Sequence, residues 1–191
     1  IFHDKEGNSL YNIQVPSLAT GMPAYKTVQV LPGNRFHIQT ILLDSVPGFN
    51  SLFPRYAKEY QYEQQHEGKV IWSKEALKSK NYQEFCDWQL QDLTRNRFVP
   101  RDLPPVLRDS LLSMQGNGFT GMEMVTDLYR LYYSSGLARL RIPASRLNAY
   151  QRYFKQLEKQ ENPDAFTCAM KSFARIFQCF LQGEPDVDFT I

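Results

Sequence analysis

Near the end of the chain, residues 163–183 read PDAFTCAMKSFARIFQCFLQG. An apolar or aromatic side chain recurs at every third or fourth position, which is the spacing of one face of an α-helix. Asn162-Pro163-Asp164 begins this helix and Gly183 ends it. A face this wide and aromatic must be covered, either by the core of the chain or by a partner. Its stripe consists of Phe166, Met170, Phe173, Phe177 and Phe180, widened by Ala169, Ile176 and Leu181.

The rest of the chain is arranged as strand patterns followed by helical patterns. Strand patterns dominate residues 1–72, helical patterns dominate 73–183, and 184–191 form an acidic, extended tail. A length of 191 residues suits a single domain, 1–191. Strands followed by helices predict an α+β fold, with an N-terminal β-hairpin or small antiparallel sheet followed by a predominantly helical part.

The β-rich part contains one clear hairpin. Residues Thr27–Leu31 and Arg35–Leu43 flank Pro32-Gly33-Asn34, a short glycine-containing loop of the kind that joins antiparallel strands. Ser9–Val15 alternates apolar and polar residues and predicts a further strand. Lys69–Trp72 is expected to add another, after a polar helix over Pro54–Glu67.

In the helical part, capping boxes mark two helix starts. Asn81 with Glu84, and Thr120 with Glu123, have the spacing at which the side chains of two residues satisfy each other's backbone N–H groups. Pro104-Pro105 pre-sets the first turn of another helix. Helices are therefore expected after Asn81, after Pro104-Pro105 up to Gly116, from Thr120 to Gly136, and over Ala144–Gln160.

Two shorter segments complete the expected fold. Gly136–Pro143 alternates, with Ala138, Leu140 and Ile142 on one side, and predicts a short strand between helices. In the tail, Val187 and Phe189 are the expected docking residues.

Residues 116–121 match the glycine pattern G-x-G-x-x-G of dinucleotide-binding turns. That mechanism requires a strand before the first glycine, so that the turn aims helix-terminal N–H groups at the pyrophosphate. Here a helix is expected before Gly116. We therefore interpret the segment as a helix end at Gly116, a turn at Asn117-Gly118 and a helix cap at Thr120.

No pattern in the sequence indicates a catalytic, metal or cofactor site, and none is expected. His3, His37 and His66 are scattered and do not pair with other ligands at metal-binding spacings. There is no G-x-S-x-G motif, and Cys86 lies among aromatic residues on an amphipathic helix, as a small core residue does.

The three cysteines do not form a disulfide framework. Cys168 and Cys179 would lie roughly 16 Å apart on one helix at ~1.5 Å per residue, beyond the ~7 Å that a disulfide spans. Buried free thiols suit a reducing compartment, so a cytoplasmic location is expected. No apolar run approaches the ~20 residues of a membrane span, and no membrane insertion is expected.

A basic segment, residues 139–159, suggests one alternative function. Six arginines and lysines face a single acidic residue there, Glu158, and Tyr150 and Tyr153 lie among them. Basic groups beside stackable rings suit single-stranded nucleic acid. Against this, the net charge of the chain is only +2, and a solvated helix face has the same composition.

Aromatic residues are abundant, at 14% of the chain, and several helices carry them on more than one side. Tyrosine favours interfaces because its ring is apolar while its hydroxyl stays hydrated. The candidate protein-binding residues are Tyr129, Tyr132 and Tyr133, with Arg139 and Arg141 as polar anchors. They predict binding to other proteins in a hetero-oligomeric complex.

Taken as a whole, the tyrosine- and glutamine-rich chain resembles small bacterial secretion adaptors, such as those of the Dot/Icm type IVB coupling complex. The stretches that prompt this resemblance are Tyr56–His66 and Gly121–Arg141. The resemblance covers the chain loosely and transfers no site residue. It implies a non-enzymatic cytoplasmic subunit that sits with other adaptors on the C-terminal tail of the coupling ATPase and helps to recruit effectors.

The leading interpretation is therefore an α+β adaptor or chaperone-like subunit that binds other polypeptides. Nucleic-acid binding through residues 139–159 is the first alternative. The second is an enzyme whose site is assembled from residues far apart in the sequence, for example His37, His66, Cys86 or carboxylates.

Overall fold

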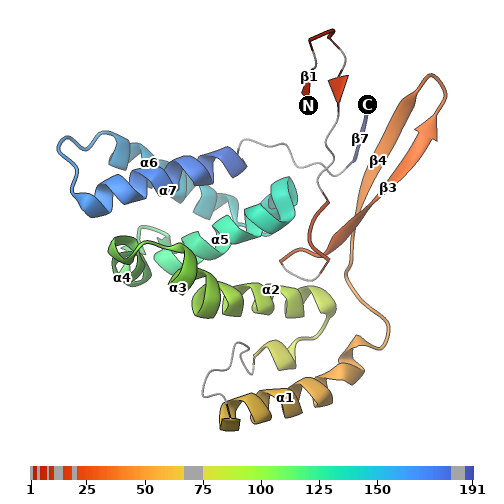
Figure 1. The fold of residues 1–191 in the computed structure, drawn as a ribbon, viewed down its shortest axis with the longest axis horizontal. Helices are drawn as coiled ribbons and strands as arrows, with labels where there is room; N and C mark the ends of the chain where they lie inside the picture. The colour runs from red at the N-terminus through yellow and green to blue at the C-terminus, as the bar shows by residue number, and fades with distance from the viewer. Residues whose placement is uncertain are drawn as a thin grey trace.

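The computed structural model describes residues 2–3, 5–7, 9–10, 15–18, 21–66, 75–181 and 188–191. A slender antiparallel sheet stands beside a larger helical body (Figure 1), which confirms the predicted α+β class. The helices are α1 (Phe53–His66), α2 (Tyr82–Leu93), α3 (Val99–Asp102), α4 (Pro105–Ser113), α5 (Gly121–Ser134), α6 (Ala144–Glu158) and α7 (Ala165–Leu181).

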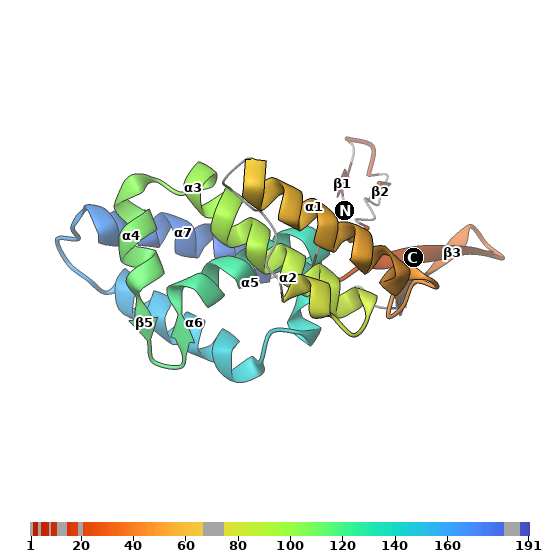
Figure 2. The ribbon, with the colours of Figure 1, turned by 90° about the horizontal axis from the view of Figure 1, so that it is seen from below.

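The sheet is built on the predicted hairpin. Strands β3 (Ala24–Leu31) and β4 (Arg35–Leu42) pair antiparallel, and β7 (Asp188–Thr190) adds to the far side of β4. Gly33 and Asn34 adopt the positive φ angles, 78° and 55°, that this tight connection needs. The hairpin extends away from the helices and forms one end of the molecule (Figures 1 and 2).

The base of the hairpin is attached to the helical body by a small apolar cluster. Met22, Ala24 and Leu137 are buried together there, and the hydroxyl oxygen of Ser134 accepts a hydrogen bond from the Met22 N–H at 3.1 Å. This cluster connects the sheet to the end of α5.

The predicted docking of the tail is confirmed for Phe189. It lies opposite the buried Ile38 in the pairing of β7 with β4, and the Lys26 ammonium sits 5.3 Å from its ring centre. Val187 falls outside the described residues, as does the predicted strand Lys69–Trp72. Of the predicted strand Ser9–Val15, the structure assigns β2 (Ser9–Leu10), which pairs with β1 (Phe2–His3).

The aromatic stripe of α7 is covered by the core of the chain itself. Met170, Phe173 and Phe177 are buried against α4, α5 and α6. The Phe177 ring meets the Tyr150 ring at 5.2 Å and the Phe154 ring at 5.6 Å, both close to edge-to-face. Burying side chains of this size contributes about 1.5–3 kcal/mol each, which makes α7 the centre of the helical core.

The prediction is wrong for one residue of the apolar face of α7. Ile176 is 53% exposed, because its position turns it toward solvent between the buried Phe173 and Phe177. The helix begins as expected: the Asp164 carboxylate accepts a hydrogen bond from the Thr167 N–H at 2.7 Å.

Both predicted helix starts are capped, but only Thr120 and Glu123 form the reciprocal capping box, since Glu84 bonds the Lys80 N–H in place of the Asn81 N–H. The Asn81 side chain accepts from the Glu84 N–H at 2.9 Å, and the Glu84 carboxylate accepts from the Lys80 N–H at 2.7 Å. At α5, the Thr120 hydroxyl oxygen accepts from the Glu123 N–H at 3.1 Å, while the Glu123 carboxylate accepts from the Thr120 N–H at 2.7 Å. Local sequence thus fixes where α2 and α5 begin.

The glycine-rich segment 116–121 forms a tiny hairpin rather than a phosphate loop. Strands β5 (Gln115–Gly116) and β6 (Phe119–Thr120) pair across the expected Asn117-Gly118 turn, with Gly118 at φ 97°. The prediction that Gly116 ends the preceding helix is wrong, because α4 already ends at Ser113 and Gly116 lies in β5. A Cβ on Gly121 would lie 1.6 Å from the Leu111 carbonyl oxygen, so only glycine lets α5 begin this close to α4.

The strand predicted over Gly136–Pro143 is wrong. Residues Ser135–Leu140 form a 3₁₀ helix instead. The adjacent Leu137 and Ala138 are both buried, whereas Leu140 is 59% exposed. Burial therefore follows a helical turn and not the strict alternation of a strand.

Candidate protein-binding surfaces

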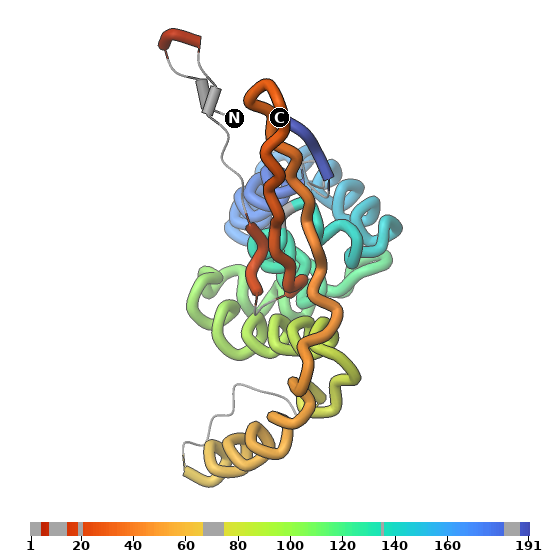
Figure 3. The backbone as a smooth tube through the Cα atoms, turned by 90° about the vertical axis from the view of Figure 1, so that its right-hand side faces the viewer, coloured from red at the N-terminus to blue at the C-terminus, as the bar shows by residue number. Residues whose placement is uncertain are grey.

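Helix α1 lies at one edge of the molecule (Figures 1 and 3). It contacts α2 through aromatic side chains. The Tyr56 ring stacks on the Phe85 ring at 6.0 Å, and Phe53 lies 5.9 Å from the same ring. Phe85 in turn meets the buried Phe49 at 4.9 Å. None of the residues of α1 is buried.

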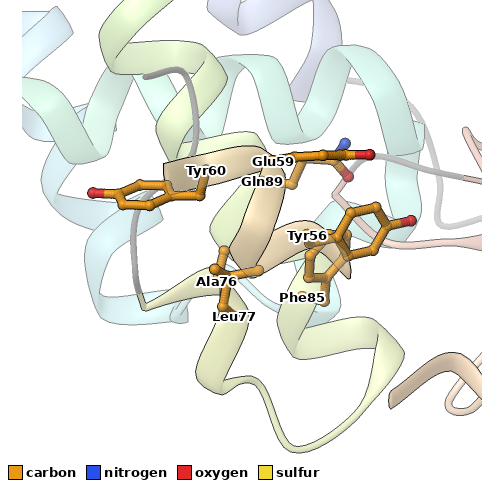
Figure 4. A pocket seen from close by; sticks show the side chains of 7 residues that line it. All are labelled: Tyr56, Glu59, Tyr60, Ala76, Leu77, Phe85 and Gln89. Atoms are coloured by element: carbon orange, nitrogen blue, oxygen red, sulfur yellow. The ribbon is translucent and has the colours of Figure 1, made fainter. Parts of the chain in front are cut away.

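A recess of about 190 Å³ opens between α1 and α2, and we call it the α1–α2 cleft. Figure 4 shows Tyr56 beside Phe85 at one side of the cleft, Tyr60 at the other, and Ala76 and Leu77 along its base. It is smaller than the ~300 Å³ at which small-molecule pockets begin, so it fits an apolar side chain better than a cofactor. The cleft is lined by Tyr56, Glu59 and Tyr60 of α1, Ala76 and Leu77 of the 3₁₀ turn Ala76–Lys78, and Phe85 and Gln89 of α2.

The three tyrosines singled out from the sequence lie together on the last turns of α5, but they differ in their contacts and in their exposure. Tyr129 donates its hydroxyl to the Asp102 carboxylate at 2.7 Å and lies 4.4 Å from the Phe98 ring. Burial raises the pKa of Tyr129, and the Asp102 hydrogen bond adds to this. Tyr133 also faces Phe98, at 6.0 Å. Tyr132 is 53% exposed.

The two arginines predicted as anchors do not converge on one recess with these tyrosines. Arg139 is half-buried and lines a shallow recess with Leu147 and Leu181. Arg141 is exposed and lines a different recess, beside Arg146. Within the described residues the structure therefore groups the tyrosines on one helix and separates the arginines into two recesses.

A second, larger recess of about 530 Å³ lies between α2, the start of α5 and the start of α6, elements that can be followed in Figure 2. We call it the arginine recess, because four arginines line it. Three carboxylates share its walls. Its lining consists of Asp87, Gln91, Arg95, Thr120, Met122, Glu123, Thr126, Asp127, Arg130, Arg141, Pro143 and Arg146.

Asp127 is the centre of a buried polar network beneath this recess. Its side chain is wholly buried and forms ion pairs with Arg130 and with Arg146, whose Nε lies 2.8 Å from Asp127 Oδ2. Tyr150 donates its hydroxyl to the same oxygen at 2.8 Å. A buried carboxylate needs such partners, because water no longer solvates its charge.

Each of these two arginines also bridges to a second carboxylate. Arg130 Nη2 lies 2.5 Å from Asp87 Oδ1, and Arg146 Nη1 lies 2.9 Å from Glu123 Oε1. Burial raises the pKa of Asp127, although both arginines oppose this effect. For Glu123, burial also acts upward, but the Thr120 hydrogen bonds and Arg146 outweigh it and lower the pKa.

Some side chains of the basic segment 139–159 are paired or packed within the protein. Arg146 is paired in the Asp127 network, and Tyr150 is wholly buried. Tyr153 is half-buried with its ring 5.7 Å from Phe119. The two tyrosines expected to stack on bases therefore pack inside the protein, whereas Arg152 and the lysines of the segment are exposed.

The groups considered for a dispersed catalytic site lie on different elements. His37 is on β4, 3.5 Å from Asp188, and the His66 ring stacks on Tyr62 at the end of α1, 4.1 Å away. Cys86 is buried in α2 as predicted, and desolvation raises its pKa to about 11. In the part of the chain that the structure describes, no three His, Cys, Asp or Glu side chains are grouped to hold a metal ion.

The expectation that the cysteines are buried is wrong for two of them. Cys168 and Cys179 are exposed on α7, because they lie outside the stripe that faces the core. All three cysteines are free thiols.

Sequence reasoning missed both recesses. The signal for the Asp127 network was a carboxylate placed among Met124, Val125, Leu128 and Leu131 in an apolar run, with an arginine three residues later. For the α1–α2 cleft, the spacing of Tyr56 and Tyr60 marks one face of a helix but not the neighbour that this face meets.

Helices long and apolar enough to cross a membrane are absent from the described residues. Comparison with known proteins found no matching family model, no matching curated protein and no matching solved structure.

Proposed function

We propose that the chain is a non-enzymatic adaptor or chaperone-like subunit that binds another polypeptide through the α1–α2 cleft. The observation that carries the proposal is an apolar recess with aromatic walls, formed by a helix that has no buried residue of its own. Tyrosine and other aromatic residues contribute strongly to binding where they form or fill such pockets.

The chemistry of the cleft supports a polypeptide ligand. Rings and aliphatic groups form most of its wall, and Glu59 and Gln89 supply a polar rim. An apolar centre with a polar rim is the ordinary anatomy of a protein interface. Its volume of about 190 Å³ suits one anchoring side chain of a partner.

The exposed Tyr132 extends the proposal to a second surface. Its ring lies 5.1 Å from Tyr133 and 5.8 Å from Phe180, so an aromatic patch continues from α5 to the end of α7. Arg139 lines the neighbouring shallow recess with Leu181 of the same helix.

The resemblance to secretion adaptors gives a more specific form of the proposal. In that form the protein is cytoplasmic, joins a hetero-oligomeric assembly at a type IVB coupling ATPase and helps to recruit effectors. The test is whether the C-terminal tail of such an ATPase is captured by the protein in stoichiometric amount.

The proposal is tested by quantitative affinity capture from native cytoplasm, with and without nuclease, read by mass spectrometry. Tyr60→Ala probes the cleft, and Tyr132→Ala and Arg139→Ala probe the second surface. Tyr62→Ala is the matched control, because Tyr62 is also on α1 but is 60% exposed and does not line the cleft.

We expect a protein partner that survives nuclease, binds the wild type and Tyr62→Ala equally, and is lost with Tyr60→Ala. Equal capture by every folded variant would refute the cleft and the Tyr132 surface together. Loss of all partners after nuclease would favour nucleic acid instead.

A further inference from the structure

The arginine recess has more positive charge than its own carboxylates neutralise. Four arginines and three carboxylates line it, which leaves an excess of one positive charge. The three carboxylates, Asp87, Glu123 and Asp127, are all paired with Arg130 or Arg146. This paired group therefore has a net charge of −1, and the other two arginines contribute two positive charges.

Those two arginines, Arg95 and Arg141, come from different walls of the recess. Arg95 is in the wide helical turn Thr94–Phe98 that follows α2, and Arg141 is in the connection before α6. Both are exposed, and neither guanidinium has a hydrogen bond, ion pair or ring contact with any residue that the structure describes. Each offers five N–H donors in a planar fork that suits a carboxylate.

The paired arginines give the recess a fixed floor. Arg130 is only 7% exposed and Arg146 is 18% exposed, and each is held by two carboxylates. The floor of the recess is therefore already ordered, and only the exposed Arg95 and Arg141 side chains lose freedom when a ligand binds.

The size and the charge of the recess together select the ligand. About 530 Å³ is in the range of ligand pockets, and holds several side chains rather than a lone ion. Each of the two unpaired arginines matches one carboxylate, which has a single negative charge. A phosphomonoester concentrates about −1.5 to −2 on one group at neutral pH, and so brings more negative charge close to the carboxylates of the wall.

We propose that the arginine recess binds glutamate or aspartate side chains of an acidic polypeptide segment, with Arg95 and Arg141 as the donors that contact the ligand. The inference rests on the proposed function only in taking the ligand to be a polypeptide. The site itself is separate from the α1–α2 cleft, because the two recesses share no lining residue.

The test measures fluorescence polarisation of a short labelled peptide with glutamate at alternate positions. The work is done at ~0.15 M salt, where screening over about 8 Å suppresses unspecific attraction. Arg95→Gln combined with Arg141→Gln removes the two free donors. Arg55→Gln combined with Arg152→Gln removes the same charge from exposed positions outside the recess.

We expect the recess variant to weaken peptide binding roughly tenfold and the control variant to change it less than about twofold. A matched peptide with glutamine in place of glutamate should not bind. Equal weakening by the two variants would overturn the proposal, since binding would then follow total charge.

Two further probes test the nature of the ligand. Tighter binding of a peptide with phosphoserine in place of glutamate would overturn the assignment to carboxylates. Displacement of the glutamate peptide by an equal concentration of succinate would overturn the assignment to a polypeptide. Neither result depends on Tyr60 or Tyr132, so failure here and failure of the cleft are distinguishable.

Discussion

Helix α7 has 17 residues, five of them buried, whereas α1 has 14 residues and none buried. Both helices carry four aromatic side chains. In α7 all four are phenylalanine, and in α1 three of the four are tyrosine. A phenylalanine ring has no polar group that water can solvate. A tyrosine hydroxyl stays solvated at an interface while its ring makes apolar contact.

The comparison shows that aromatic content alone does not separate a core helix from a peripheral one. The α7 rings recur on a single face, and α4, α5 and α6 cover that face. The α1 rings divide between Tyr56 and Tyr60, which face the cleft, and Tyr62, which faces solvent. A helix with rings on two sides and no buried residue leaves apolar surface uncovered, as the proposed binding role requires.

The largest expected loss of stability comes from a substitution in α7. Phe177→Ala should lower the free energy of unfolding by about 3–5 kcal/mol, since it removes a wholly buried ring that meets Tyr150 and Phe154 and leaves a cavity. Urea denaturation measures the change. This loss is a large share of the 5–15 kcal/mol that is typical for the free energy of unfolding. Phe177→Leu leaves a smaller cavity and therefore serves as the milder variant. A loss below about 1 kcal/mol for Phe177→Ala would contradict the central place of α7.

The features that sequence predicted well are local ones. The α7 stripe and the capping box at Thr120 and Glu123 depend on residues three or four positions apart, which share a helix turn wherever the helix lies. The hairpin was predicted for the same reason, from the turn at Gly33-Asn34 between alternating segments.

The candidate sites depend on contacts that local spacing does not specify. Arg130 meets Asp87 across 43 positions and Arg146 meets Asp127 across 19, so neither pair has a local signature. Tyr129 was grouped with Arg139 and Arg141 because the three residues are near one another in the sequence. The 3₁₀ helix that forms after α5 directs the two arginines into different recesses.

A smaller effect is expected at the start of α7. Hydrogen bonds from Thr167 lower the pKa of the Asp164 carboxyl. A lowered folded-state pKa means that ionised Asp164 stabilises the fold above its unfolded pKa, and that this stabilisation is lost as pH falls through the folded value. Asp164→Asn keeps an acceptor oxygen but cannot titrate.

We therefore expect the wild type to melt higher than Asp164→Asn at pH 7, and the gap to close below the ordinary aspartate pKa of about 3.8. The difference should be smaller than that of Phe177→Ala. Thermal melts of both proteins at several pH values measure it. A gap that widens in acid would contradict the capping role of the ionised carboxylate.

The smallest effect should come from the outer face of α1. Tyr62 is 60% exposed, and its closest aromatic contact is with His66, one turn further along the same helix. Tyr62→Ala should therefore change the free energy of unfolding by less than about 0.5 kcal/mol in the same urea assay, as exposed substitutions usually do. A loss near that of Phe177→Ala would mean that α1 is part of the core. Tyr62 would then no longer serve as the control for the cleft, and the contrast between the two helices would disappear.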